Sequence, residues 1–230
     1  MSKISISENL EVIHNNIEKA LIKSGRKDKV DLVAVTKTID VDRIKEAIDL
    51  GVKNIGENKV QELEIKIPLL ENSVDYHMIG YLQTNKVKYI IDKVKLIHSL
   101  DRKSLAEELD KRARQKDYIA QVLLQVNVAE EETKSGLKLE EVLPFLEEIL
   151  ELKNIRIRGL MTIAPNTNDE AFLRNVFRSL YNLKEDIAGR HYENISMDYL
   201  SMGMTNDYSL AIEEGSNMVR VGTGIFGKRK

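Results

Sequence analysis

The feature that most constrains the fold is a repeated alternation between two kinds of segment. Short apolar segments rich in β-branched residues, typical of buried strands, alternate with segments whose apolar residues have helical spacing. The predicted strands are Val30–Thr36, Val52–Ile55, Val74–Ile79, Val94–His98, Ile119–Val128, Ile155–Thr162, Ile195–Leu200 and Met218–Val221. Strand followed by helix, repeated in this way, predicts a parallel sheet with right-handed crossovers.

The segments outside the predicted strands favour helices. An apolar stripe from Leu10 to Leu21 precedes the first strand, with Ser7 as the expected N-cap and Gly25 as the expected end. Asp40 is expected to open the next helix. The other expected helices cover 58–68, 84–91, 139–149, 172–189 and 205–213, and another is indicated by Leu105, Leu109 and Ala113 after Asp101.

Eight strand–helix units in 230 residues match a (β/α)8 barrel of the TIM type, whose usual size is about 250 residues. The chain after the last predicted strand is too short for a closing helix. We therefore expect the N-terminal helix, residues 7–24, to fill that place in the outer ring. An open doubly wound sheet is the alternative. No linker rich in Ser or Gly divides the chain, so residues 1–230 are predicted to form one domain.

Composition narrows the possible functions. A formal net charge of −2 argues against a nucleic-acid or membrane-surface binder. The absence of cysteine excludes disulfides and thiolate metal sites, and the four scattered histidines lack the spacing of a metal site. No apolar run reaches the ~20 residues of a membrane span, and the polar N-terminus lacks the apolar segment of a signal peptide. A cytoplasmic protein without a metal is expected.

In a parallel barrel the working residues lie at the carboxyl ends of the strands. Lys37 ends the most apolar strand, and the period of two places it on the same face as Val33 and Val35. If that face lines the barrel, the amine projects into the top of a largely dry interior. Desolvation there lowers the pKa of a lysine, and a less protonated amine can attack an aldehyde to form a Schiff base. The simpler alternative is a solvated lysine that begins a loop.

Two glycine-containing segments follow the last two predicted strands, where barrels frequently bind phosphate. Gly222, Thr223 and Gly224 form one candidate wall of a phosphate site, and Ser201 with Gly203 forms the other. Ordinary glycine turns are the alternative explanation.

Arg220 shares a face with Gly222 and is expected to enter the lumen, where a guanidinium needs a partner. That partner would be either a carboxylate on the next strand or a ligand atom. A phosphate site beside a strand-end lysine suits pyridoxal 5′-phosphate (PLP). It also suits sugar phosphates that form imines, so the residues alone leave both open.

Several longer motifs resemble those of the pyridoxal phosphate homeostasis protein family, single-domain relatives of the alanine racemase barrel. They are LVAVTKT at 32–38, IGENKVQE at 55–62, HMIGYLQTNK at 77–86, IRGLMTIAP at 157–165, LSMGMTND at 200–207 and GSNMVRVGTGIFG at 215–227. Together they cover almost the whole predicted barrel.

The resemblance implies PLP held as a Schiff base on Lys37. It implies that Arg220 faces the pyridine nitrogen. The other implied cofactor-binding residues are Asn58, Ser201, Met202, Gly203, Gly222 and Thr223, with Ser201, Gly222 and Thr223 at the phosphate. Lys59, Thr205 and Gly224 depart from the residues common in the family, namely tyrosine, serine and alanine.

The resemblance also bears on catalysis. An arginine at the pyridine nitrogen opposes its protonation and so weakens the electron sink of PLP enzymes. A two-base racemase needs a second acid/base, which the alanine racemase relatives take from a tyrosine on a separate β-domain. We therefore expect a monomer that holds, buffers or delivers PLP, with PLP-dependent enzymes as recipients. The alternatives are a weak PLP-dependent racemase or lyase and a class I aldolase-like barrel.

Overall fold

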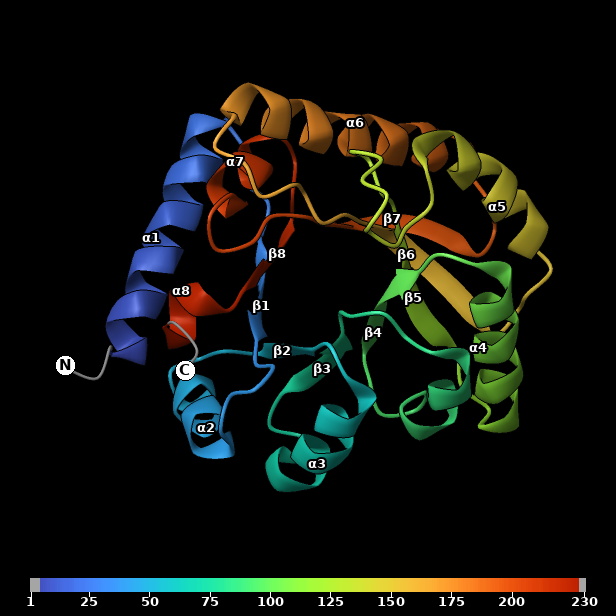
Figure 1. Cartoon of the computed structure of the whole chain (residues 1–230), viewed down its shortest axis with the longest axis horizontal. Helices are drawn as coiled ribbons and strands as arrows, with labels where there is room; N and C mark the ends of the chain where they lie inside the picture. The colour runs from blue at the N-terminus through green and yellow to red at the C-terminus, as the bar shows by residue number, and fades with distance from the viewer. Residues whose placement is uncertain (1–4, 228–230) are drawn as a thin grey trace.

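A computed structural model describes residues 5–227, and within them eight parallel strands close into a barrel in the order β1 to β8 (Figure 1). β1 pairs in parallel with both β2 and β8, so the sheet has no open edge there. This closure confirms the predicted (β/α)8 barrel and excludes the open doubly wound sheet.

The strands agree with the predicted segments to within a few residues at each end. They are β1 Asp31–Val35, β2 Asn54–Glu57, β3 Asp75–Met78, β4 Leu96–Leu100, β5 Ala120–Gln125, β6 Ile155–Met161, β7 Ile195–Ser201 and β8 Met218–Val221.

Helices connect the strands and form the outer ring. They are α1 Ile6–Lys23, α2 Val41–Asp49, α3 Val60–Leu70, α4 Lys103–Gln115, α5 Val142–Ile149, α6 Glu170–Gly189, α7 Tyr208–Glu213 and α8 Thr223–Phe226, with 3-10 turns η1 Thr84–Tyr89 and η2 Leu139–Glu141. The helix expected at 84–91 is therefore a 3-10 turn. Asp40 is the N-cap residue of α2, as expected.

The N-terminal helix α1 lies beside α7 and the four-residue α8, at the place in the ring that a closing helix would otherwise take (Figure 1). Asn9 Nδ2 donates to the carbonyl oxygen of Ile225 at 2.9 Å, which ties α1 to α8. The expected N-cap is wrong by two residues, because Ser5, and not Ser7, accepts from the amide of Glu8. The helix starts earlier because Ile6 joins the buried stripe.

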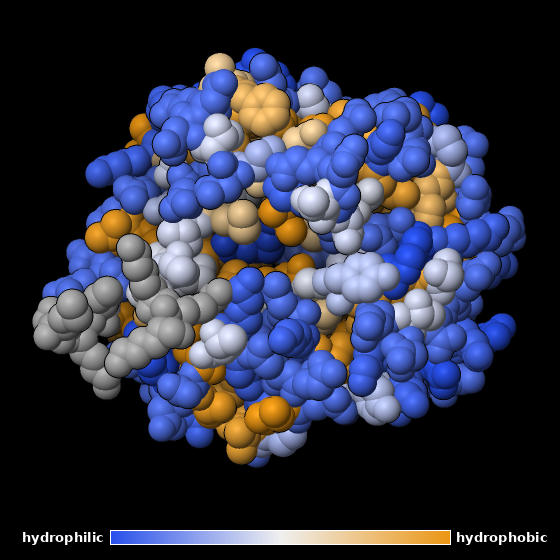
Figure 2. Space-filling view, in the orientation of Figure 1, coloured by the Kyte–Doolittle hydropathy of each residue, from blue (hydrophilic) through white to orange (hydrophobic). Residues whose placement is uncertain are grey.

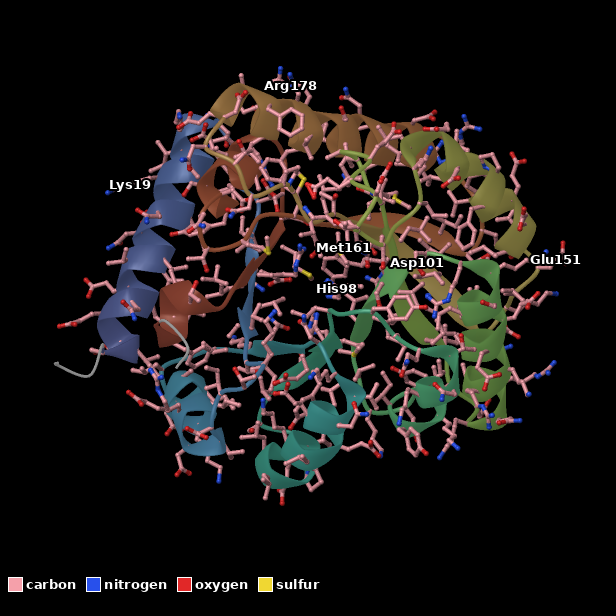
Figure 3. All side chains as sticks on the ribbon, in the orientation of Figure 1. Lys19, His98, Asp101, Glu151, Met161 and Arg178 are labelled. Carbon is pink, nitrogen blue, oxygen red and sulfur yellow. The ribbon has the colours of Figure 1, made fainter. Side chains whose placement is uncertain are left out.

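The core has two layers, as the alternation of side chains in a strand requires. One layer fills the lumen and contains Val33, Val35, Ile79, Leu96, Leu123, Met161 and Met218. The larger layer lies between the strands and the helices and contains Ala34, the residue between Val33 and Val35. Figure 3 places Met161 and His98 inside the ring of strands.

The face in Figure 2 is hollowed near its middle, with hydrophilic residues at the bottom of the hollow and hydrophobic ones beside it. Among residues 5–227, no helix is long and apolar enough to cross a membrane.

Candidate functional site

A cavity of about 530 Å³ opens at the carboxyl end of the barrel. Its wall is made by the segments that follow four strands: Lys37 after β1, residues 164–170 after β6, residues 204–207 after β7, and Gly222 with Thr223 after β8. The carboxyl end is where barrel enzymes and binding proteins of this architecture place their sites.

Lys37 lines this cavity, as the alternation along β1 predicts. Val33 and Val35 are buried in the lumen, whereas Ala34 packs outside the sheet. Lys37 therefore continues the inward face, and its side chain is half-buried. The prediction that this strand directs Lys37 toward the lumen side is confirmed.

A buried polar cluster behind β1 holds the residues on either side of Lys37. Thr36 Oγ1 donates to Glu57 Oε1 at 2.6 Å, and the backbone amide of Thr38 donates to Glu62 Oε2 at 2.7 Å. Lys66 Nζ donates to Glu57 Oε1, to the carbonyl oxygen of Thr36 and to Glu62 Oε2, at 2.7, 2.8 and 2.9 Å.

Burial raises the pKa of the Glu57 carboxyl, although hydrogen bonds from Lys66 and Thr36 act against it. Thr38 has a φ of +61°, a left-handed conformation that a β-branched residue adopts only where its surroundings impose it. The cluster therefore fixes the backbone that presents the amine. Sequence reasoning missed Glu57, which ends the strand β2. It also missed Glu62 and Lys66 on α3, because an acidic and basic pattern on a helix usually indicates a solvated face.

Arg220 is almost fully buried and forms part of the cavity wall. Its Nη1 donates to the carbonyl oxygen and the Oγ of Ser201, at 2.8 and 2.6 Å, and its Nη2 donates to the carbonyl oxygen of Thr162 at 2.7 Å. Burial lowers the pKa of Arg220 to about 10, with Asp207 acting in the opposite direction. The guanidinium is therefore still charged at neutral pH.

Two kinds of partner were expected for Arg220, a carboxylate on the next strand or a ligand atom, and the carboxylate is not found among its hydrogen-bond partners in residues 5–227. Those partners are neutral oxygens on β7 and on the residue after β6, and among residues 5–227 no carboxylate forms an ion pair with this guanidinium. A buried cation held only by neutral oxygens retains a strong field toward the cavity.

The glycine-containing segments after β7 and β8 come together at the cavity. Thr223 Oγ1 lies 3.2 Å from Thr205 Oγ1, and the amide of Gly224 donates to Thr205 Oγ1 at 3.3 Å. A Cβ on Gly224 would lie 2.8 Å from Val221 Cγ1 and 3.2 Å from Thr205 Cγ2, so these two side chains would have to shift to make room for a larger residue there. The result is a cavity wall of hydroxyl groups and backbone.

The structure brings four of the predicted site residues to this one cavity: Lys37, Arg220, Gly222 and Thr223. Ser201 lies below it, with its hydroxyl against Arg220 and His98. Met202 and Gly203 are buried beside Ser201, where Gly203 has a φ of +93° and packs against α7.

Asn58 lies apart from these residues, in a neighbouring cavity of about 260 Å³ at the same end of the barrel, which it lines with Gly80 and Tyr81. Sequence reasoning treated Thr205 only as a departure from the family pattern, yet its hydroxyl lines the main cavity. Residues 165–168 also line the main cavity and were not predicted as site residues. The signal that could have found them is the polar segment that directly follows β6.

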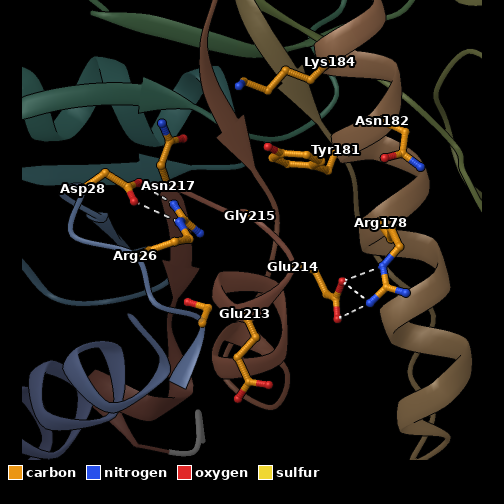
Figure 4. Close-up of a pocket in the computed structure, with 11 residues that line it drawn as sticks. Arg26, Asp28, Arg178, Tyr181, Asn182, Lys184, Glu213, Glu214, Gly215 and Asn217 are labelled. Atoms are coloured by element: carbon orange, nitrogen blue, oxygen red, sulfur yellow. Dashed lines mark hydrogen bonds and ion pairs between the residues drawn. The ribbon is translucent and has the colours of Figure 1, made fainter. Parts of the chain in front are cut away.

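Another cavity, of about 520 Å³, lies near the amino ends of β1 and β8 (Figure 4). Its charged groups satisfy one another: Arg178 Nη2 lies 2.8 Å from Glu214 Oε2, and Arg26 pairs with Asp28. We therefore assign the functional site to the carboxyl end. Among residues 5–227, no three histidine or carboxylate side chains are grouped closely enough to hold a metal ion.

Comparison with known proteins identifies the family of the chain. The family model described as alanine racemase, N-terminal domain, matches residues 9–230. A protein of Aquifex aeolicus named pyridoxal phosphate homeostasis protein is 44% identical over 225 residues, which cover 97% of this chain and 98% of the relative.

The chain belongs to the pyridoxal phosphate homeostasis protein family, within the alanine racemase N-terminal domain group.

Solved structures of similar proteins show the same barrel. A Bifidobacterium adolescentis protein described as unknown is 36% identical, with a TM-score of 0.92 and coverage of 96% of this chain and 94% of that one. PipY of Synechococcus elongatus, solved with PLP bound, is 31% identical, with a TM-score of 0.82 and coverage of 97% and 100%. The predicted family membership and the alanine racemase-like barrel are thus confirmed for this homeostasis-family chain.

Proposed function

We propose that this protein binds PLP in the cavity at the carboxyl end of the barrel and acts in intracellular PLP homeostasis. The observation that carries the proposal is the meeting of Lys37, Arg220 and the Thr205–Thr223 hydroxyl pair around one cavity. An amine, a buried cation and a wall of hydroxyls and glycine match the three polar parts of PLP: its aldehyde, its ring nitrogen and its phosphate. PipY, a relative whose whole chain is covered by the match, was solved with PLP bound.

In this proposal the Lys37 amine condenses with the PLP aldehyde to form a Schiff base, and one water is released. Thr205, Gly222 and Thr223 hold the phosphate through hydroxyl and backbone groups. Asn58, Ser201, Met202 and Gly203 keep their predicted cofactor-binding roles as proposals. Sugar phosphates would satisfy the same amine and phosphate groups, but they supply no ring nitrogen for Arg220.

Arg220 also argues for a protein without committed catalysis. PLP supplies an electron sink when its ring nitrogen is protonated, and a neighbouring guanidinium opposes that protonation. Arg220 is held in place by three hydrogen bonds, so it remains a fixed cation. Among the described residues that line the cavity there is no tyrosine or histidine, and the titratable side chains there besides Lys37 and Arg220 are the carboxyls of Glu170 and Asp207.

The visible spectrum of the purified protein with PLP tests this proposal. We expect an imine band in the wild type that is absent in Lys37→Ala. A wild type that shows only the spectrum of free PLP would contradict it.

The PLP-loaded protein should also leave amino acids unchanged when hydrogen exchange at Cα is followed in deuterated water. Exchange well above that of free PLP would instead support a weak racemase or lyase. Transfer of PLP to an apo PLP-dependent enzyme, compared with transfer from free PLP, tests the delivery role.

A further inference from the structure

A chain of hydrogen bonds crosses the lumen below the cavity, and the proposed binding gives no role to its two histidines. His98 Nδ1 lies 3.1 Å from Ser201 Oγ, and His98 Nε2 lies 2.9 Å from His77 Nδ1. His77 Nε2 lies 3.3 Å from Asn54 Oδ1, and Arg220 Nη1 closes the other end on Ser201 Oγ at 2.6 Å. Both imidazoles are buried, and Figure 3 shows His98 inside the ring of strands.

The two ends of the chain fix the direction of every hydrogen bond in it. A guanidinium can only donate, so Ser201 Oγ accepts from Arg220. At the other end an amide oxygen can only accept, so His77 carries a proton on Nε2 and donates to Asn54 Oδ1. With both imidazoles neutral, His77 Nδ1 then accepts from His98 Nε2–H, and His98 Nδ1 accepts from the Ser201 hydroxyl. Each imidazole then has a single tautomer.

The far end of the chain is closed by backbone. Asn54 Nδ2 is directed to the carbonyl oxygen of Leu32, which can only accept, and this sets the orientation of the Asn54 amide. Within residues 5–227, the groups that the chain of hydrogen bonds meets at that end are the Asn54 amide and the Leu32 carbonyl, and neither is titratable. The chain is thus suited to hold groups in place, and it cannot deliver protons to the cavity.

The charges around the imidazoles support the neutral form. Burial lowers the pKa of His77 to about 4, with Lys95 acting in the same direction and Asp75 and Asp31 against it. Burial also holds the pKa of His98 well below its ordinary value, helped by His77 and Arg220.

We propose that His98 and His77 are positioning residues for the cofactor site, which hold the Ser201 hydroxyl and, through it, the Arg220 guanidinium at the cavity wall. The inference rests on the proposed function only in taking Arg220 as the group beside the cofactor ring. Its structural basis is independent of PLP. With the Ser201 proton committed to His98, the Ser201 oxygen presents its lone pairs to Arg220. The hydrogen bonds from His98 and His77 thereby keep the Ser201 oxygen in place as an acceptor for the guanidinium.

Nitrogen-15 NMR of histidine side chains tests this chain of hydrogen bonds without any cofactor. The chain has four histidines, and His14 and His191 are exposed, so the spectra of single variants assign all four. We expect His77 and His98 to show neutral Nε2–H tautomers that persist at pH 6. An Nδ1–H tautomer, or protonation of either buried imidazole at pH 6, would overturn the proposal.

Three variants test whether this chain of hydrogen bonds affects the binding of PLP. His98→Leu removes the acceptor of the Ser201 hydroxyl, and His98→Asn keeps an acceptor at the position of Nδ1. Leu123→Ala is the matched control, because it opens a cavity in the same lumen and removes none of the hydrogen bonds between Arg220 and Asn54. We expect His98→Leu to lose PLP affinity by about tenfold, His98→Asn to recover most of it, and Leu123→Ala to stay close to the wild type.

Borohydride trapping at Lys37 distinguishes a failure of the positioning role from a failure of the proposed function. If the wild type traps PLP and His98→Leu binds it as tightly as the wild type, the positioning role is wrong and the proposed function stands. Equal losses in His98→Leu and Leu123→Ala at equal thermal stability would also refute positioning. If the wild type traps no PLP, the proposed function is wrong. The histidine tautomers alone then decide whether the chain of hydrogen bonds is as proposed. Should His98→Leu fail to fold, two measurements decide the positioning role: the PLP affinity of His98→Asn relative to the wild type, and the histidine tautomers.

Discussion

Replacing Lys66 with methionine isolates the cluster that supports Lys37. Lys66 Nζ makes three hydrogen bonds of 2.7 to 2.9 Å, and one of its partners, Glu57, is fully buried. Lys66→Met removes the cation and leaves the Glu57 carboxylate with only the Thr36 hydroxyl. Breaking one side of a buried ion pair costs about 3–5 kcal/mol of unfolding free energy. For a chain of this length that corresponds to a melting temperature lower by roughly 6–20 °C.

The same variant has a defined pH dependence. The pKa of Glu57 is already raised above its ordinary value of 4.5 by burial, and loss of Lys66 raises it further. A carboxyl whose pKa is higher in the folded state than in the unfolded state lowers stability as the pH rises between those two values. The deficit of Lys66→Met should therefore be largest at neutral pH and shrink as the pH falls toward 4.5.

Thermal and urea unfolding from pH 4.5 to pH 8 measures this effect, with Glu57→Gln/Lys66→Met as the matched double variant. Glutamine can still accept from Thr36 and carries no charge, so the double variant should recover at least half of the loss. A deficit below about 1 kcal/mol at pH 8, or one that grows as the pH falls, would refute the account of a desolvated pair.

Three further predictions concern the cavity itself. Thr223→Ala should weaken PLP retention by about tenfold while borohydride still traps the imine, since one hydrogen bond to a charged phosphate is lost; retention equal to the wild type in equilibrium dialysis would argue against the phosphate site. Arg220→Gln should raise Cα hydrogen exchange of amino acids above the wild-type level, measured by NMR in deuterated water, because the cation that opposes ring protonation is gone; exchange that stays at the wild-type level would contradict that role. Gly203→Ala should destabilise the protein by about 1–3 kcal/mol, because its φ is +93° and a Cβ would lie 2.7 Å from Ala211 Cβ. In Gly189→Ala, where nothing lies within 4 Å, unfolding should be unchanged or slightly harder, and equal losses in both variants would show that close packing is not the cause.

The barrel could be predicted because its signal is periodic and local. Each strand is an apolar run set off from the helices by polar or glycine residues, and the period of two along β1 was enough to place Val33, Val35 and Lys37 on the lumen side. The glycine-containing segments after β7 and β8 were visible for the same reason, since both follow strands directly.

The contacts that the polar groups make inside the protein could not be predicted in this way. Glu57 and Lys66 meet only because α3 folds back over β2, and the sequence between them resembles an exposed helix. His77 and His98 lie on neighbouring strands, but whether a strand residue faces the lumen or the helices depends on the start of each strand to within one residue. The partners of Arg220 are backbone oxygens and one hydroxyl, which carry no distinctive sequence signal.

The covalent bond to PLP is the most direct test of the account. Borohydride reduction of the PLP-loaded protein, followed by proteolysis and mass analysis of the peptides, should place a single reduced adduct on the peptide that contains Lys37. An adduct distributed over surface lysines, with the Lys37 peptide unmodified, would contradict it.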